Sequence, residues 1–190
     1  MSQLIREGAD LHSSTAEALG IPRDAAKRIN FGVIYGIGAG ALSEQLRIDK
    51  KTAYKYLDQY HGLYPQFRVL MNACERMAEE KGHIRMWTGR MRHYDARNPT
   101  HKAMSNLIQG GVAEMMRVAI TRAYPILHEL GGYMILQVHD QVIYELPDEV
   151  VEMGVPILKA NMENFDFDPA MTVDVSIGDR WGTMKQWPKK

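Results

Sequence analysis

Apolar positions recur at helical spacing through the first half of the chain. Gly20 and Pro22 mark a stop and a new start, because proline suits the first turn of a helix. Gly36 then breaks that helix, Asp49 is placed to cap another, and Gly82 follows the end of a third. The pattern predicts helices over residues 22–35, 41–47, 50–60 and 65–81.

Short apolar or alternating runs predict strands in five places. These are residues 83–87, 91–94, 133–138, 142–146 and 171–177, with tight turns at 88–90 and 139–141. In the last run Val173, Val175 and Ile177 alternate with polar residues, which is the period of a strand. A long helix is expected from about His101, with Pro125 kinking or ending it. Another runs from Pro147 to about Asn164. The order predicts an α+β fold, helical first and then built around a small antiparallel sheet with flanking helices.

The composition is that of an ordinary globular protein. Of 190 residues, 45% are hydrophobic and 24% are charged, with 23 basic and 23 acidic residues and a net charge of zero. Proteins that bind nucleic acid are often basic overall, so this balance counts against that class. It does not exclude the class, because a local basic face can exist within a neutral total.

Cys74 is the only cysteine, so the chain can form neither an internal disulfide nor a cysteine-based zinc site. Its neighbours Met71 and Met77 indicate a position in a helical core. No apolar run approaches the ~18 residues of a membrane span, and the start lacks the apolar core of a signal peptide. A reducing cytoplasm is the expected location.

Arg23, Lys27, Phe31 and Tyr35 are spaced by four and therefore share one face of the predicted helix. Two cations followed by two rings can hold a nucleoside triphosphate lengthwise. Cations neutralise phosphate, and a ring stacks on a base at roughly 1–3 kcal/mol. Gly32 costs about 1 kcal/mol within a helix, which indicates that something approaches the backbone there. The same spacing also fits an amphipathic helix with solvated cations and packed rings.

Asp140 lies in a predicted tight turn, His139-Asp140-Gln141, between two apolar strands. Such a turn holds a carboxylate rigidly and exposes it. Metal-dependent phosphoryl transfer needs carboxylates of this kind, because two divalent ions activate the attacking oxygen and stabilise the leaving group. An Asp in a β-turn is also a common turn former without further function.

Taken together, Arg23-x-x-x-Lys27-x-x-x-Phe31-Gly-x-x-Tyr35-Gly resembles the fingers-helix motif of family A DNA polymerases, the bacterial polymerase I and phage replicative type. Just before it, Asp10-x-His-x-x-Thr resembles a second segment of that family. The resemblance implies that Arg23 and Lys27 contact the triphosphate of a deoxynucleotide and that Lys27 is catalytic. It implies that Phe31 packs on the incoming base or sugar and that Tyr35 lies near the templating base.

The turn resembles the family's Val-His-Asp-Glu hairpin. The resemblance implies that Asp140 is catalytic and binds two Mg²⁺ ions, with His139 near the primer terminus. Gln141 replaces the usual Glu and offers an oxygen without a negative charge, so metal affinity or pH response is expected to be weaker.

Three further stretches resemble parts of the same family. Residues 88–92 with Arg90, residues 105–110 with Asn106 and Gln109, and the closing Gly178-x-x-Trp181 carry the match, which spans roughly residues 8–187. By this resemblance, Arg90, Asn106 and Gln109 contact primer-template DNA. Gln109 would lie in the minor groove, which is read by shape more than by sequence.

The resemblance implies a fingers subdomain over residues 1–97 and the C-terminal half of a palm over residues 98–190. The family's other catalytic Asp lies upstream of the Asp-x-His segment. None of the nine residues before Asp10 is an Asp, and one carboxylate cannot hold two metals. The chain is therefore expected to work with a second polypeptide that carries the thumb and the missing Asp, in a bacterial or phage-infected cell.

Two alternatives remain open from the sequence. The chain could be a catalytically inactive truncated copy of a polymerase. It could also be a non-catalytic DNA-binding module, since residues 41–54 loosely resemble a helix-turn-helix.

Overall fold

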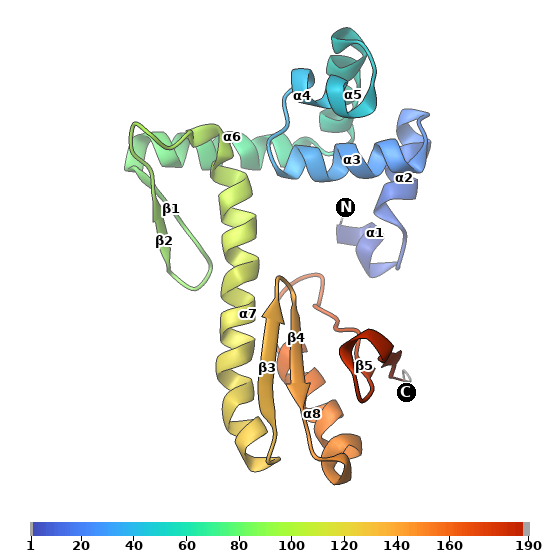
Figure 1. Cartoon of the computed structure of the whole chain (residues 1–190). Helices are drawn as coiled ribbons and strands as arrows, with labels where there is room; N and C mark the ends of the chain where they lie inside the picture. Colours follow the sequence, from blue (N-terminus) through green and yellow to red (C-terminus); the bar gives the residue numbers. More distant parts are fainter. Residues whose placement is uncertain (1, 188–190) are drawn as a thin grey trace. The chain divides into compact units, whose positions relative to one another are not determined.

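A computed structural model describes residues 2–187 (Figure 1). The chain forms two compact units, Met1–Glu114 and Met115–Lys190. The boundary between the units falls inside one long helix, whereas the sequence places its domain boundary between residues 97 and 98. Within residues 2–187, no helix has both the length and the apolar character needed to cross a membrane.

The first unit begins with six helices. They are α1 Ser2–Arg6, α2 Leu11–Leu19, α3 Arg23–Ile34, α4 Ala39–Leu46, α5 Lys50–Leu63 and α6 Pro65–Lys81. The four predicted helices are confirmed, each to within about three residues at its ends. Their limits have the expected causes: the Asp49 side chain accepts from the backbone N–H of Thr52, and Gly82 ends α6 with φ of 67°. Such a left-handed residue is cheapest as glycine.

Two clusters of buried side chains hold the first unit together. One joins α2, α3, α4 and α5 through Ile29, Leu42 and Tyr60, which are fully buried. The other joins α6 to the following hairpin and helix through Cys74, Ile84 and others. Cys74 is thus the core residue that its neighbours predict, and burial raises the pKa of its thiol.

A short hairpin packs against the long helix of the chain. Strands β1 His83–Arg85 and β2 Met91–His93 are antiparallel, with His83 opposite His93. The indole Nε1 of Trp87, next to the turn, donates to the carbonyl of Gly111 over 3.0 Å. This bond ties the hairpin to the helix that carries the predicted DNA-contacting residues.

That helix, α7, runs over Ala103–Glu129 after the short 3₁₀ helix η1 Thr100–Lys102. Pro125 lies inside α7, and the helix continues past it to Glu129. The prediction that Pro125 could end this helix is therefore wrong. The missing N–H of Pro125 removes one helical bond. The next turn nevertheless continues, because Leu127 is buried and Leu130 N donates to the carbonyl of Ile126 over 3.1 Å.

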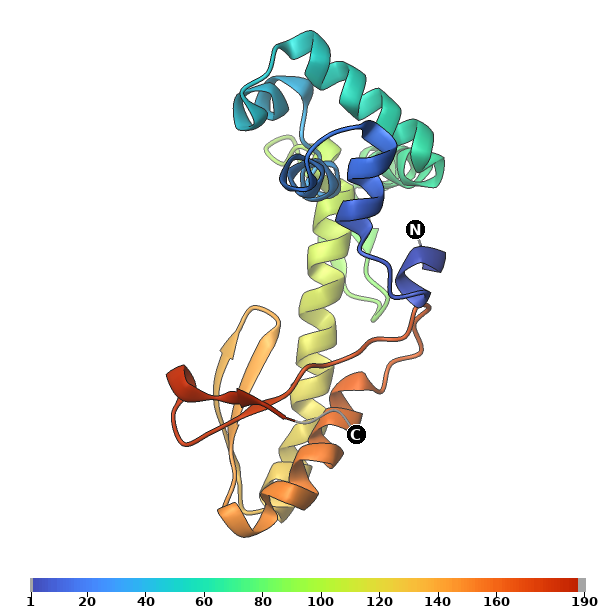
Figure 2. The same cartoon turned by 90° about the vertical axis from the view of Figure 1, so that its right-hand side faces the viewer.

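The second unit places a hairpin against two helices. Its elements are β3 Tyr133–Val138, β4 Gln141–Glu145, η2 Asp148–Val150, α8 Val151–Glu163, β5 Ser176–Ile177, η3 Trp181–Thr183 and β6 Lys185–Gln186. Figure 2 shows α8 and the end of α7 on the same side of the hairpin. Ala123, Leu127 and Leu158 form the core there, with Tyr144 and Leu146 packed on it. The predicted α+β fold is confirmed.

The predicted strand over residues 171–177 is wrong for most of its length. Only Ser176 and Ile177 pair with another strand, the unpredicted β6. The alternation itself is real, because Val173, Val175 and Ile177 are half-buried while the residues between them are exposed. A strand also needs a neighbour to bond with. Within residues 2–187, a neighbouring strand is present only beside Ser176 and Ile177.

Gly32 in α3 is explained by a close neighbour. A Cβ at this position would lie 2.7 Å from Cγ2 of Ile37, so the gain of about 1 kcal/mol in helix propensity is outweighed by overpacking. We expect Gly32→Ala to lower the free energy of unfolding by about 1–2 kcal/mol in chemical denaturation.

Gly40→Ala in α4 is the matched control, since a Cβ there meets nothing within 4 Å and should stabilise the helix. Gly32→Ala and Ile37→Ala should couple in a double-mutant cycle. Strictly additive effects would contradict the contact.

Candidate functional site

One face of α3 is solvent-exposed along its whole length. Arg23, Lys27, Phe31 and Tyr35 all lie on it, with Phe31 43% and Tyr35 49% exposed. Ala26, Ile29 and Val33, on the opposite face, are buried. The alternative in which both rings pack into a core is therefore wrong. Two rings left in water beside two cations form a surface suited to a ligand with a flat apolar part and an anionic part.

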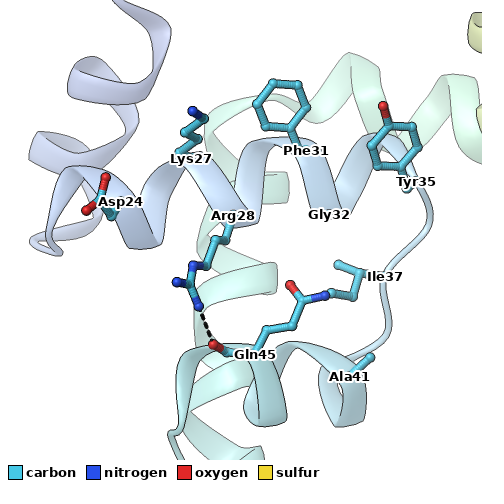
Figure 3. Close-up of a pocket in the computed structure, with 9 residues that line it drawn as sticks. All are labelled: Asp24, Lys27, Arg28, Phe31, Gly32, Tyr35, Ile37, Ala41 and Gln45. Atoms are coloured by element: carbon cyan, nitrogen blue, oxygen red, sulfur yellow. Dashed lines mark hydrogen bonds between the residues drawn. The ribbon is translucent and has the colours of Figure 1, made fainter.

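This face borders a hollow of about 590 Å³ between α3 and α4, a size common for small-molecule sites. Figure 3 shows Lys27, Phe31 and Tyr35 along one edge of α3 and Arg28 reaching toward α4. Nη1 of Arg28 donates to the carbonyl of Gln45 over 2.6 Å. This bond joins the two walls of the hollow.

The start of α2 lies beside the same face. Asp10 caps α2, and its Oδ2 also accepts from Nε of Arg23 over 2.6 Å. This hydrogen bond from Arg23 holds the pKa of Asp10 well below its usual range and raises the pKa of Arg23. Because Nε of Arg23 donates to Asp10, the guanidinium is held at the first turn of α3. The helix dipole favours an anion at this same end of the helix.

His12 lies beside this face and is a candidate site residue that the sequence reasoning did not select. Its ring centroid lies 5.5 Å from that of Phe31, and its Nδ1 lies 2.8 Å from the amide Nδ2 of Asn30. Because an amide nitrogen only donates, Nδ1 accepts and the ring proton resides on Nε2. Asn30 is itself buried and bonded to Thr15. The Asp10-x-His12 motif in the sequence could have identified His12 as a candidate.

Arg90 is engaged within the protein. Its Nη1 donates to Oε1 of Glu114 over 2.8 Å, and Oγ1 of Thr88 donates to Oε2 of the same carboxylate over 3.0 Å. Glu114 is 8% exposed, and a buried carboxylate requires such partners. The pair fastens the hairpin turn to α7, which accounts for Arg90 without DNA.

The two predicted DNA-contacting residues of α7 differ in their surroundings. Nδ2 of Asn106 donates to the hydroxyl of Tyr94 over 2.8 Å, and Asn106 is half-buried. Gln109 is exposed on the helix. Gln109 is therefore better placed than Asn106 to reach an external partner.

Asp140 is exposed at the tip of the β3–β4 hairpin. Val138 pairs with Gln141, so His139 and Asp140 form a two-residue loop. His139 has φ of 52°, a region that costs a residue with a Cβ roughly 1–2 kcal/mol. Such strain often marks functional positions. Asp140 belongs to the second unit and the α3 face to the first, so the predicted site residues come from both units.

Comparison with known proteins identifies relatives along nearly the whole chain. The sequence profile of DNA polymerase family A matches residues 1–183. The chain is 32% identical over 205 residues to the thermostable DNA polymerase I of Thermus filiformis, covering 98% of the chain and 25% of that protein. It is 34% identical to DNA polymerase I of Rhizobium leguminosarum, covering 93% of the chain and 20% of that protein. The chain thus spans about a quarter or less of the length of these relatives.

A solved structure shares the fold. It is the polymerase domain of Pol1 from M. smegmatis in complex with DNA primer-template and dNTP, with a TM-score of 0.79 at 24% identity. The match covers 88% of this chain and 33% of that one. At 24% identity, this similarity shows a shared fold and does not by itself assign a function.

The strain at His139 can be measured. His139→Gly and His139→Ala both remove the imidazole, but glycine adopts a positive φ without cost. We expect the glycine variant to be more stable than the alanine variant by about 1 kcal/mol in thermal or chemical unfolding. At Gln137, within β3, the order should reverse, because glycine weakens a strand. An alanine variant at 139 as stable as the glycine variant would show that the turn carries no strain.

Proposed function

The chain belongs to DNA polymerase family A, and we propose that it provides the nucleotide-binding face and one catalytic carboxylate for template-directed DNA synthesis. The observation that carries this proposal is the exposed α3 face, with two cations followed by two rings that the fold leaves in water. A helix rises about 1.5 Å per residue. Arg23 and Tyr35 therefore lie roughly 18 Å apart along its axis, room for a triphosphate and its base.

In this proposal Arg23 and Lys27 bind the triphosphate, and Lys27 also stabilises charge that develops during transfer. Phe31 packs on the incoming base or sugar, and Tyr35 lies beside the templating base. The Nε2–H of His12, directed by Asn30, offers a further donor next to Phe31. Three donors and two rings held by helices would orient a substrate with little motion.

We further propose that residues 1–97 act as fingers and residues 98–190 as the C-terminal half of a palm. Gln109 and His139 would contact primer-template DNA, and both are exposed. Arg90 and Asn106 would act on DNA in part through the hairpin that they fasten. The segment with the loose helix-turn-helix pattern forms α4 and α5, within the matched residues 1–183. It is accounted for as part of the polymerase fold.

Mg²⁺ is the proposed metal, with Asp140 as one ligand. Within residues 2–187, no three or more His, Cys, Asp or Glu side chains gather as a metal site. Asp140 fits a site that it shares with the substrate, since Mg²⁺ takes one or two carboxylates together with phosphates and waters. The ion's contribution when bound is stabilisation of charge on the phosphoryl oxygens. Gln141 beside it adds an amide oxygen without charge.

A separate polypeptide is the proposed source of the rest of the polymerase, including the thumb and the second Asp. The expectation follows from the resemblance, in which the second Asp lies upstream of the Asp10-x-His segment. Its relatives in Thermus filiformis and Rhizobium leguminosarum are bacterial polymerases, which supports the proposed place in the cytoplasm of a bacterial or phage-infected cell.

Primer extension tests the proposal. With Mg²⁺ and deoxynucleotides, we expect the 190-residue chain alone to extend a primer weakly or not at all. Adding the part of Rhizobium leguminosarum DNA polymerase I that precedes the segment matching this chain should restore synthesis. Synthesis should be lost again with Asp140→Asn in the mixture. Robust extension by the chain alone would contradict the need for a partner.

Lys27→Ala tests the role of the α3 face. In the reconstituted enzyme we expect nucleotide affinity to fall at least tenfold, on the order of 1.4 kcal/mol, because a phosphate contact is lost. Lys55→Ala, an exposed lysine of α5, is the matched control and should leave the affinity unchanged. Equal affinities for Lys27→Ala and the wild-type chain would rule out the phosphate contact.

A further inference from the structure

Two histidines face each other across the β1–β2 hairpin. His83 and His93 are direct partners in the antiparallel pairing, and their ring centroids lie 5.7 Å apart with the planes tilted by 45°. The proposed function gives neither residue a task. Imidazole nitrogen is a good ligand for Zn²⁺, Ni²⁺ and Cu²⁺, so the geometry of the pair bears on whether it can bind such an ion.

The backbone pairing brings these two side chains close together. In an antiparallel ladder, hydrogen-bonded and non-hydrogen-bonded pairs alternate. Tyr94 N donates to the carbonyl of Gly82 over 2.8 Å, so the next pair along the hairpin, His83 and His93, is of the non-hydrogen-bonded kind. In such pairs the Cα atoms are about 4.5 Å apart and the side chains are closer than in bonded pairs. Both imidazoles therefore leave the same face of the hairpin at short spacing.

One of the two rings is already oriented as a ligand. Nδ1 of His83 lies 2.9 Å from the backbone carbonyl oxygen of Lys81. A carbonyl oxygen only accepts, so Nδ1 donates and carries the ring proton. In the neutral ring the lone pair then lies on Nε2. Histidines that bind metals commonly donate their other ring N–H to a carbonyl or a carboxylate in this way.

The ring separation suits a shared ion. Zn²⁺ binds histidine nitrogen at about 2.0–2.1 Å in tetrahedral geometry, which puts the centroids of two bound imidazoles roughly 5–6 Å apart. The observed 5.7 Å falls in this range. His93 is exposed and His83 is half-buried, so an ion can reach the pair from solution.

The arginines of the hairpin leave room for a cation. Arg92 pairs with the buried Ile84, and the alternation of a strand puts both on the face opposite to the histidines. Arg85 shares the face of the histidines. Its Nε donates to the carbonyl of Gly89 over 3.3 Å, which directs the guanidinium toward the turn and away from the pair.

We propose that His83 and His93 together bind a Zn²⁺ ion, through Nε2 of His83 and a ring nitrogen of His93, with waters completing the coordination. Two side chains hold an ion less tightly than the four of a structural zinc site, so occupancy follows the Zn²⁺ concentration. The bound ion would join β1 to β2 at the end of the hairpin next to α6. This site is chemically distinct from that of Asp140, because Mg²⁺ prefers oxygen ligands, and it does not depend on the proposed function.

The test titrates the full chain with Zn²⁺ by calorimetry, in excess Mg²⁺ to occupy sites made of oxygen ligands. We expect His83→Gln and His93→Gln each to weaken Zn²⁺ binding at least tenfold. The two substitutions should be strongly coupled in a double-mutant cycle, because either one removes the shared site. His128→Gln, at an exposed histidine of α7, is the matched control and should leave the affinity unchanged.

NMR of the histidine rings in the wild-type chain decides the question even where a variant fails to fold. We expect the ring signals of both His83 and His93 to shift when Zn²⁺ is added and to stay in place with Mg²⁺ alone. A shift of one ring only, or of neither, would overturn the shared site and leave a pair that only stacks across the strands. Equal Zn²⁺ affinity in the wild-type chain and in a folded His83→Gln or His93→Gln variant would overturn it as well.

Discussion

Burial of one side of α3 is the interaction on which the candidate site depends. Ala26, Ile29 and Val33 are removed from water in the core of the first unit, and burial of large apolar side chains is worth about 1.5–3 kcal/mol each. Helical geometry then leaves the face with Lys27 and Phe31 no position except in solvent. The exposed stripe of cations and rings is therefore a consequence of core packing. Its chemistry is set by residues that the core does not constrain.

Polar contacts refine that face without covering it. Asp10 holds Arg23 at the first turn, and Asn30 directs the ring of His12 toward Phe31. Exposed ion pairs contribute little stability, so the Asp10 pair matters for orientation more than for folding. Arg90 and Asn106 show the opposite case. Their side chains bond to Glu114 and Tyr94, and they hold a hairpin against a helix.

The second unit is governed by a different constraint, the need of every strand for a neighbour. The β3–β4 hairpin holds Asp140 at a strained two-residue tip, yet its outer edge and much of its apolar surface are open. The chain spans about a quarter of the length of its relative from Thermus filiformis.

Local patterns were sufficient to determine much of this protein. Apolar periodicity, Asp49 as a cap and Gly82 as a stop predicted the helices, because helical hydrogen bonds join near neighbours in sequence. The four-residue spacing of Arg23, Lys27, Phe31 and Tyr35 likewise predicted a shared face. The tertiary structure decided what depends on distant partners. It exposed both rings, brought His12 and Asp10 beside α3, paired Arg90 with Glu114, and left residues 171–175 without a strand. Contacts of that kind join residues far apart in the chain, and no local pattern contains them.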